Sequence, residues 1–404
     1  MKNLWKKYNS YSLIVRISLG LLIGVLLGIF CPQLTFFSLF GTIFVGALKS
    51  IAPLLVFVLV ISSIVNAKGS NISNRFSKVI GFYLFSTFSA AFVTVCLCFL
   101  FPVKMPLQNA VSDSVSIAPP SGITEVFETL LSNIVVNPVS SIANANYIGI
   151  LFWAILFAVA LKNVAGESLA TGFKQISDAV SKIVAWIISF APFGVMGLVF
   201  NSVSSNGLGI FTEYGKIVAL LLGCMAFIAL VITPLIVGLT LRKNPYPLVL
   251  RCYKESGITA FFTRSSAANI PVNIALCEKM NLDSSFYTVS LSLGSTINMN
   301  GAAVTITTMT MATAFALGID VDFLSAIFLS FIATLGSCGA SGVAGGSLLL
   351  IPMACSLFGI PADISMTVVG IGFIIGVIQD SVETAINSST DVIYTATAEL
   401  SERK

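Results

Sequence analysis

Six apolar runs, each close to the length of a membrane-spanning helix, dominate the first 241 residues of the chain. They cover roughly residues 11–30, 37–65, 79–101, 148–161, 183–200 and 217–241. A helix needs about 20 apolar residues to cross the hydrocarbon core of a bilayer. Charged residues make up only 9% of the chain, against about 25% in soluble domains, which is too few to cover a water-facing surface. The sequence therefore predicts an all-α polytopic membrane protein.

Basic residues in the short connections predict the orientation of these spans, because cytoplasmic connections are rich in Lys and Arg. On one side of the predicted topology they stand at positions 2, 6, 7, 68, 75, 78, 174, 182, 242, 243, 251, 254, 403 and 404. The opposite side has chiefly Lys104 and Lys216, and it carries the one long polar connection, residues 102–146. We therefore expect a multi-pass protein of the bacterial cell inner membrane with both termini cytoplasmic. The first run is expected to be a retained helix rather than a cleaved signal peptide.

The residue types that are missing exclude several classes of function. The chain has no histidine and eight cysteines. None of the cysteines forms a CxxC pair, so we expect neither a zinc site nor a disulfide framework. Histidine is the commonest side chain for acid–base work and for metal binding, and its absence disfavours an enzyme. The basic residues are spread over short connections and form no domain-like cluster, so no nucleic-acid partner is expected.

Two segments in the last 160 residues predict re-entrant hairpins. The first lies between Lys243 and Asp283 and has a polar centre at residues 263–269. Its basic flanks at both ends belong to the cytoplasmic side, so it cannot be a single span. The second lies between Asp322 and Asp363, with apolar arms 323–335 and 348–358 around the Gly- and Ser-rich residues 336–347. Each of these arms is about 18 Å of helix, roughly half the hydrocarbon core.

Acidic flanks predict that the second hairpin enters from outside, so that the two tips meet near the membrane midplane. Paired interrupted segments of this kind are typical of the binding site between inverted repeats of a transporter. The alternative interpretations of the Gly-rich stretch are a surface loop between short helices, or close helix packing by small residues.

The last helix is predicted to carry a polar stripe. Asp380, Glu383 with Thr384, Asn387 and Asp391 recur at helical spacing and share one face. Carboxylates in the membrane need a cation or a wet, coordinated site. A helix end already in water is the alternative, chiefly for Glu383. Asp380 and Asp391 lie about 16 Å apart along the helix, too far to share a proton as an aspartyl catalytic pair.

Residues 294–301, Gly-Ser-Thr-Ile-Asn-Met-Asn-Gly, lie in the middle of a long uncharged stretch, residues 284–319. Two Asn and two Gly there predict an unwound turn whose freed carbonyls face a ligand. Carbonyl and carboxylate oxygens are hard donors, and sodium is the cation that suits so few acids. A Gly/Asn-kinked packing helix is the alternative.

These motifs together carry a resemblance to a known family. Thr263-Arg264-Ser265-Ser266, Asn298-Met299-Asn300-Gly301, the Gly-Val-Ala-Gly-Gly stretch 342–346 and the pair Asn387 and Asp391 are similar to the dicarboxylate/amino acid:cation symporter family, which includes the glutamate transporters. Within it, the chain most resembles the bacterial serine/threonine:sodium symporters. The resemblance implies about eight transmembrane helices, two re-entrant hairpins, an inverted-repeat fold and a homotrimer.

The resemblance also implies two domains. Residues 1–241 would be mainly a static scaffold, with the third and sixth helices joining a transport domain whose core is residues 242–404. The transport domain would carry substrate by an elevator motion.

The family's substrate-binding residues can be carried over one by one. Asp380 would hold the substrate amino group, and Asn387, helped by Thr384, the substrate carboxylate. The two hairpin tips would contribute Ser266 and Val343. Acidic-substrate members have an arginine where this chain has Glu383, and a threonine where it has Ala302.

A glutamate would repel an acidic side chain and could accept a hydrogen bond from a hydroxyl, so we expect L-serine and L-threonine as substrates, in preference to alanine and valine. A sodium- or proton-coupled dicarboxylate or aspartate symporter of the same fold, and an amino-acid-gated channel, remain the alternatives.

Sodium is the coupling ion that the resemblance implies. One family site would use the carboxylate of Asp391 with carbonyls of Gly294, Asn298 and Asn387. The second family site would use the carbonyls of Thr296, Ser337, Cys338 and Ala340. The deepest family site has an aspartate where this chain has Asn300, beside hydroxyls that match Ser86 and Thr87. Because the anion is lost there, we expect fewer than three sodium ions per cycle.

Overall fold

The computed structural model describes residues 11–66, 74–107, 132, 135–164, 166–338 and 345–403, and these are helices with their connections. Four continuous helical stretches have the length and apolar composition to cross a membrane: Thr35–Asn66, Arg75–Leu100, Ala191–Leu241 and Ala362–Glu402. The prediction of an all-helical membrane protein is thus confirmed. The tip residues 339–344 of the second predicted hairpin lie outside the described residues, and with them Ala340 and Val343.

The first part of the chain forms the helices α2 (Leu13–Phe30), α3 (Ser38–Asn66), α4 (Asn74–Leu100), α7 (Tyr147–Val164), α8 (Glu167–Ser189) and α9 (Ala191–Asn206), with the short pieces η1 (Thr35–Phe37), α6 (Pro138–Ala143) and η2 (Gly207–Gly209). The predicted span 183–200 crosses the boundary between α8 and α9 at Phe190. Pro192 explains the boundary, because proline has no N–H to donate and is favoured in a first helical turn.

Helices α2 and α9 touch each other backbone to backbone. A Cβ atom on Gly20 would lie 2.0 Å from the carbonyl oxygen of Pro192, and one on Gly24 would lie 2.5 Å from that of Met196. Gly28 continues the same face one turn later, against Val203. Small residues at every fourth position allow membrane helices to approach this closely, so these three glycines set the distance between α2 and α9.

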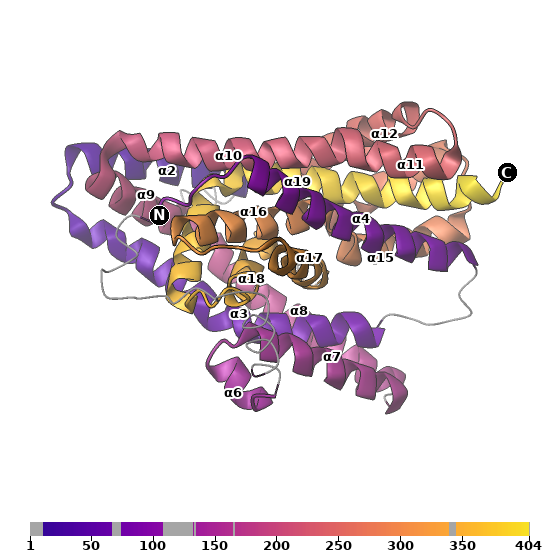
Figure 1. Ribbon diagram of the computed structural model, residues 1–404, viewed down its shortest axis with the longest axis horizontal. Helices are drawn as coiled ribbons and strands as arrows, with labels where there is room; N and C mark the ends of the chain where they lie inside the picture. The colour runs from indigo at the N-terminus through magenta and orange to yellow at the C-terminus, as the bar shows by residue number, and fades with distance from the viewer. Residues whose placement is uncertain are drawn as a thin grey trace.

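The second part of the chain forms α10 (Ile210–Phe227), η3 (Ile228–Ile232), α11 (Thr233–Leu241), α12 (Tyr246–Cys252), η4 (Tyr253–Gly257), α13 (Ile258–Thr263), α14 (Ser266–Lys279), α15 (Ser284–Ile297), α16 (Asn300–Ala316), α17 (Phe323–Ser337), η5 (Gly346–Leu350), α18 (Ile351–Ser356) and α19 (Ala362–Glu402). Helix α4 packs on α16, α17 and α19, and α10 and α11 pack on α19. Helices α2, α3, α7, α8 and α9 pack chiefly on one another. Figure 1 shows α19 running beside α10, α11 and α4 along the length of the molecule.

Two helical hairpins stand at the predicted places. In the first, α12, η4 and α13 form one arm and α14 the other, and the turn between them is Arg264 and Ser265. Glu255 joins the bases of the two arms, because it pairs with Arg251 and with Lys279, each at 2.9 Å. The basic flanks that the sequence places on one side of the membrane are therefore neighbours in space.

In the second hairpin, α17 forms one arm, and η5 with α18 forms the other. The two arms contact each other. Asp322 caps α17, since its carboxylate accepts hydrogen bonds from the N–H groups of Leu324 and Ser325 at 3.0 and 2.9 Å. Between the hairpins, the helical path breaks at Asn298 and Met299, where α15 ends and α16 begins. The unwound turn is thus confirmed and is confined to these two residues.

We expect Gly24→Ala to destabilise the fold by about 1–3 kcal/mol, because the added methyl overpacks the contact with α9. Gly81→Ala is the matched control, since a Cβ on Gly81 of α4 meets nothing within 4 Å. Thermal unfolding of the detergent-solubilised protein measures both. Equal midpoints for the two variants would show that the α2–α9 distance is not set by Gly24.

Candidate functional site

The polar stripe of α19 is buried in the interior of the folded chain. Asp380, Glu383 and Asp391 are 4%, 5% and 1% exposed. Both hairpins, α15 and α16 pack against this helix. The alternative of a solvated helix end is therefore wrong in this structure, and each carboxylate needs a partner inside the protein.

Asp380 is paired with an arginine from the tip of the first hairpin. The Arg264 guanidinium donates to Asp380 Oδ2 through Nη2 at 2.5 Å and through Nε at 2.6 Å. Arg264 has a φ of 52°, and this left-handed turn, held by the Ser265 cap on α14, directs its side chain to α19. The Gly345 N–H donates to Asp380 Oδ1 at 3.3 Å. A substrate ammonium group would therefore have to share Asp380 with Arg264.

Glu383 accepts three hydrogen bonds on a single oxygen. Thr305 of α16, Ser347 of η5 and Gln379 of α19 donate to its Oε2 at 2.7, 2.9 and 2.5 Å. Because three separate elements supply the donors, the position of this carboxylate is closely defined. A Cβ on Gly301 would lie 2.8 Å from the Glu383 carbonyl oxygen, so glycine is required there for α16 to reach α19.

The remaining predicted substrate residues lie around these two carboxylates. Asn387 Oδ1 accepts from the Gly301 N–H at 2.7 Å, which ties α19 to the start of α16. Thr384 donates to the Asp380 carbonyl at 2.8 Å, within its own helix. Ala302 is buried in the first turn of α16. Ser266 opens α14, two residues after Arg264, but no described hydrogen bond joins its hydroxyl to α19.

The predicted first sodium site is assembled around Asp391. The Asn298 amide donates to Asp391 Oδ1 at 2.8 Å and lies 3.3 Å from the Asn387 carbonyl oxygen. Gly294 lies so close that an added Cβ would be 2.7 Å from Asp391 Oδ1. The other oxygen, Asp391 Oδ2, is buried and has no hydrogen-bond donor among the described residues. A buried carboxylate oxygen without a donor among the described residues fits a hard cation.

The described residues of the predicted second sodium site lie where two helices end. The Cys338 thiol, just after the end of α17, donates to the Ile297 carbonyl at the end of α15, at 3.5 Å. Thr296 and Ser337 stand in these same last turns. Helix C-termini carry partial negative charge and free carbonyls, so this meeting point also favours a cation.

Ser86, Thr87 and Asn300 meet as predicted, but as a network of neutral hydrogen bonds. Ser86 and Thr87 donate to Asn300 Oδ1 at 3.1 and 3.0 Å. Asn300 in turn donates to Thr390 Oγ1 at 3.5 Å. The Asn300 amide oxygen lies within hydrogen-bond distance of two hydroxyls, and this cluster of neutral side chains offers no carboxylate to a cation.

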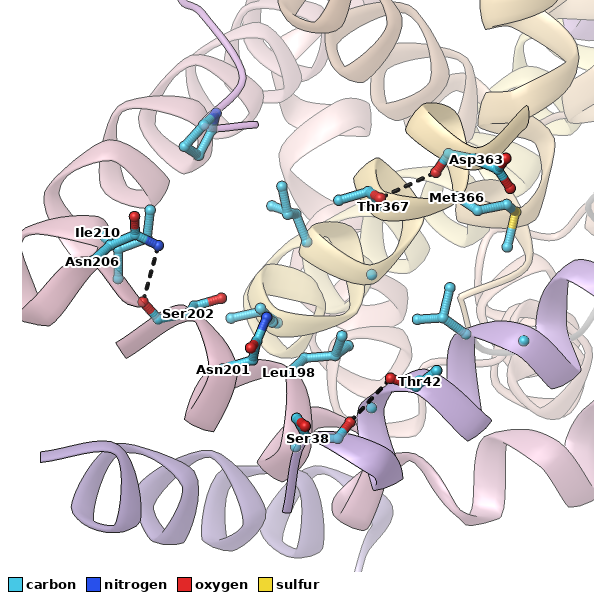
Figure 2. Close-up of a pocket in the computed structure, with 18 of the residues that line it drawn as sticks. Ser38, Thr42, Leu198, Asn201, Ser202, Asn206, Ile210, Asp363, Met366 and Thr367 are labelled. Atoms are coloured by element: carbon cyan, nitrogen blue, oxygen red, sulfur yellow. Dashed lines mark hydrogen bonds between the residues drawn. The ribbon is translucent and has the colours of Figure 1, made fainter. Parts of the chain in front are cut away.

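A separate cavity of about 490 Å³ lies between α3, α9, α10 and the first turns of α19. Figure 2 shows Thr42, Ser202 and Thr367 around it, and the hydrogen bonds drawn there each stay within one helix. At its edge Lys49 of α3 forms an ion pair with Asp363 of α19. None of the predicted binding residues that the structure describes lines this cavity, so it is distinct from the polar site on α19.

Sequence reasoning missed four residues that complete the site: Arg264 as a partner of Asp380, and Thr305, Ser347 and Gln379 as partners of Glu383. The sequence does mark Arg264, because it is the one charged residue between Glu255 and Glu278. Nothing in the sequence marks Thr305, Ser347 or Gln379, since single hydroxyl and amide side chains are common in any polar stretch.

The chain is similar to known proteins over nearly its whole length. A model of the sodium:dicarboxylate symporter family matches residues 13–400. The serine/threonine transporter SstT of Bifidobacterium adolescentis is 57% identical over 392 residues, which cover 97% of this chain and 90% of that protein.

We expect sodium to raise the unfolding temperature of the wild type relative to choline, and Asp391→Asn to lose most of this shift. A ligand that binds only the folded state stabilises it by about 2.7 kcal/mol at 100 times its Kd, and the variant lacks the anionic ligand. Asp363→Asn, an exposed aspartate on the same helix, is the control. A full sodium shift in Asp391→Asn would place the cation elsewhere.

Proposed function

Because the chain belongs to the sodium:dicarboxylate symporter family, we propose that it carries L-serine and L-threonine into the cell by symport with sodium. The family is one of transporters, so the buried carboxylates bind and release ligands and do not catalyse a reaction. The name of the 57% identical relative supports the choice of substrate. The observation that carries the proposal most directly is the buried acceptor Glu383.

Each group of the substrate would have a counterpart on or near α19. The ammonium group would bind Asp380, and the carboxylate would bind Asn387 with Thr384, near the start of α14, where a helix N-terminus favours an anion. Glu383 would accept a hydrogen bond from the side-chain hydroxyl. With Glu383 ionised, an acidic side chain would meet a like charge, and like charges in close contact across a binding interface cost several kcal/mol. The site thus favours small hydroxy amino acids over aspartate and glutamate.

Sodium would bind as a co-substrate at two places. Asp391, with its donor-free Oδ2, supports one site, and the meeting of the α15 and α17 ends supports the other. The satisfied network around Asn300 supports a stoichiometry below three. A zwitterionic substrate adds no net charge, so each sodium ion gains about 2.3 kcal/mol per 100 mV of membrane potential.

The proposed mechanism is an elevator in the bacterial cell inner membrane. About eight spanning helices and two re-entrant hairpins would be arranged with both termini cytoplasmic, as the basic connections favour. A transport domain of α4 and α10–α19 would move against a scaffold of α2, α3 and α6–α9. The division of helix contacts into these two groups supports this assignment, and so does the cavity between them. The homotrimer is proposed from family membership, with membrane lipid around it.

Uptake of labelled L-serine into proteoliposomes tests the proposal. We expect accumulation with an inward sodium gradient and none with potassium or proton gradients, and competition by L-threonine. Liposomes without protein are the control. Sodium-driven accumulation of aspartate instead would overturn the substrate, accumulation with protons alone would overturn sodium coupling, and passive equilibration without accumulation would indicate a channel.

We expect excess L-aspartate to leave serine uptake of the wild type unchanged and to inhibit Glu383→Gln. Removing the charge abolishes the repulsion, and the aspartate concentration for half-inhibition should fall by about tenfold or more. Glu213→Gln, which changes an exposed glutamate on α10, is the control. If aspartate acts equally on wild type and Glu383→Gln, the carboxylate of Glu383 does not exclude acidic substrates.

A further inference from the structure

One hydrogen-bond donor to Glu383 has the same chemistry as the side chain of the proposed substrate. The Ser347 hydroxyl donates to Glu383 Oε2 at 2.9 Å, and Ser347 is 1% exposed. A CH₂OH group bound to this carboxylate is what L-serine itself would present. The protein therefore occupies one acceptor position on Glu383 Oε2 with a hydroxyl of its own.

Ser347 belongs to a stretch that contacts both carboxylates assigned to the substrate. Two residues earlier, the Gly345 N–H donates to Asp380 Oδ1 at 3.3 Å. Gly345 has a φ of 72°, and the helix that follows it, η5, is only five residues long. The second arm of the second hairpin is thus bound at its start to Asp380 and Glu383 of α19. These are the two side chains where a substrate ammonium and hydroxyl would bind.

The other two donors to Glu383 are less able to leave. Thr305 stands within the 17 residues of α16, and Gln379 within the 41 residues of α19. Both are single side chains of long packed helices, whereas Ser347 lies next to the left-handed turn at Gly345. With three donors already on Oε2, a further hydroxyl on that oxygen must replace one of them.

We infer that Ser347 is an internal competitor of the substrate: the hydroxyl of serine or threonine takes the place of the Ser347 hydroxyl on Glu383, and Ser347 returns when the substrate leaves. This inference rests on the proposed function. One hydrogen bond replaces another, so the substrate hydroxyl gains less than a new bond to a carboxylate would give. Release in turn restores the three donors on Glu383 Oε2, which lowers the barrier to unloading.

Equilibrium binding to the full-length protein in nanodiscs, at saturating sodium, tests this role of Ser347. In Ser347→Ala the Kd for L-serine should fall about tenfold, because the substrate then adds a hydrogen bond to a charged group without displacing one. The Kd for L-alanine, or its failure to compete, should stay as in the wild type. Ser347→Thr keeps the hydroxyl and should behave as the wild type.

Two further variants separate this effect from general damage. Ser347→Cys keeps nearly the same volume with a weaker donor and should tighten serine binding by a smaller factor. Ser356→Ala removes a hydroxyl from the same hairpin arm; among the described residues it donates to the Met353 carbonyl alone. This variant should leave the Kd for L-serine unchanged.

Serine binding that weakens or stays unchanged in Ser347→Ala, or an equal gain for serine and alanine, would overturn the inference while leaving the proposed function intact. A wild type that binds no serine would overturn both.

Discussion

The three buried carboxylates of the polar stripe on α19, those of Asp380, Glu383 and Asp391, are the constraint on which the rest of this structure depends. An ionisable side chain at the centre of a bilayer costs about 2.5–3.5 kcal/mol even on insertion scales. Three interruptions of regular helix lie against these groups. The left-handed turn at Arg264 supplies a cation to Asp380, the break at Asn298 supplies an amide to Asp391, and the start of η5 reaches Asp380 and Glu383. The hairpins and the broken helix can be understood as the means by which the chain brings polar groups to α19.

The three carboxylates of the stripe have three different kinds of partner, and each kind suits a different ligand group. Asp380 has a full ion pair, Glu383 has three neutral donors, and Asp391 retains an oxygen without a donor. An oxygen without a donor is costly inside a protein unless a cation completes it. Around Asn300 the opposite holds, since hydroxyl and amide groups satisfy one another. A cation is thus expected where the fold leaves a buried oxygen without a donor, and not where neutral side chains satisfy one another.

The architecture could be predicted from the sequence because it depends on features that are local in the chain. Apolar length, the sign of the flanking charges and the spacing of Asp380, Asn387 and Asp391 each report on a single segment. The partners of the carboxylates could not be predicted, because Arg264 with Asp380 and Ser347 with Glu383 meet only after distant segments pack. The boundary at Phe190 was missed for a related reason, since the apolar run continues across it and only Pro192 marks the change.

The glycine face of α2 has a consequence for the order of events during synthesis. Its partner α9 begins roughly 160 residues later in the chain. At about 5–20 residues per second, α2 waits on the order of 10–30 seconds in the bilayer before α9 is made. During that interval Gly20, Gly24 and Gly28 present a shallow groove of exposed backbone to lipid or to the insertion machinery. The close contact between α2 and α9 can therefore form only well after α2 itself has been made.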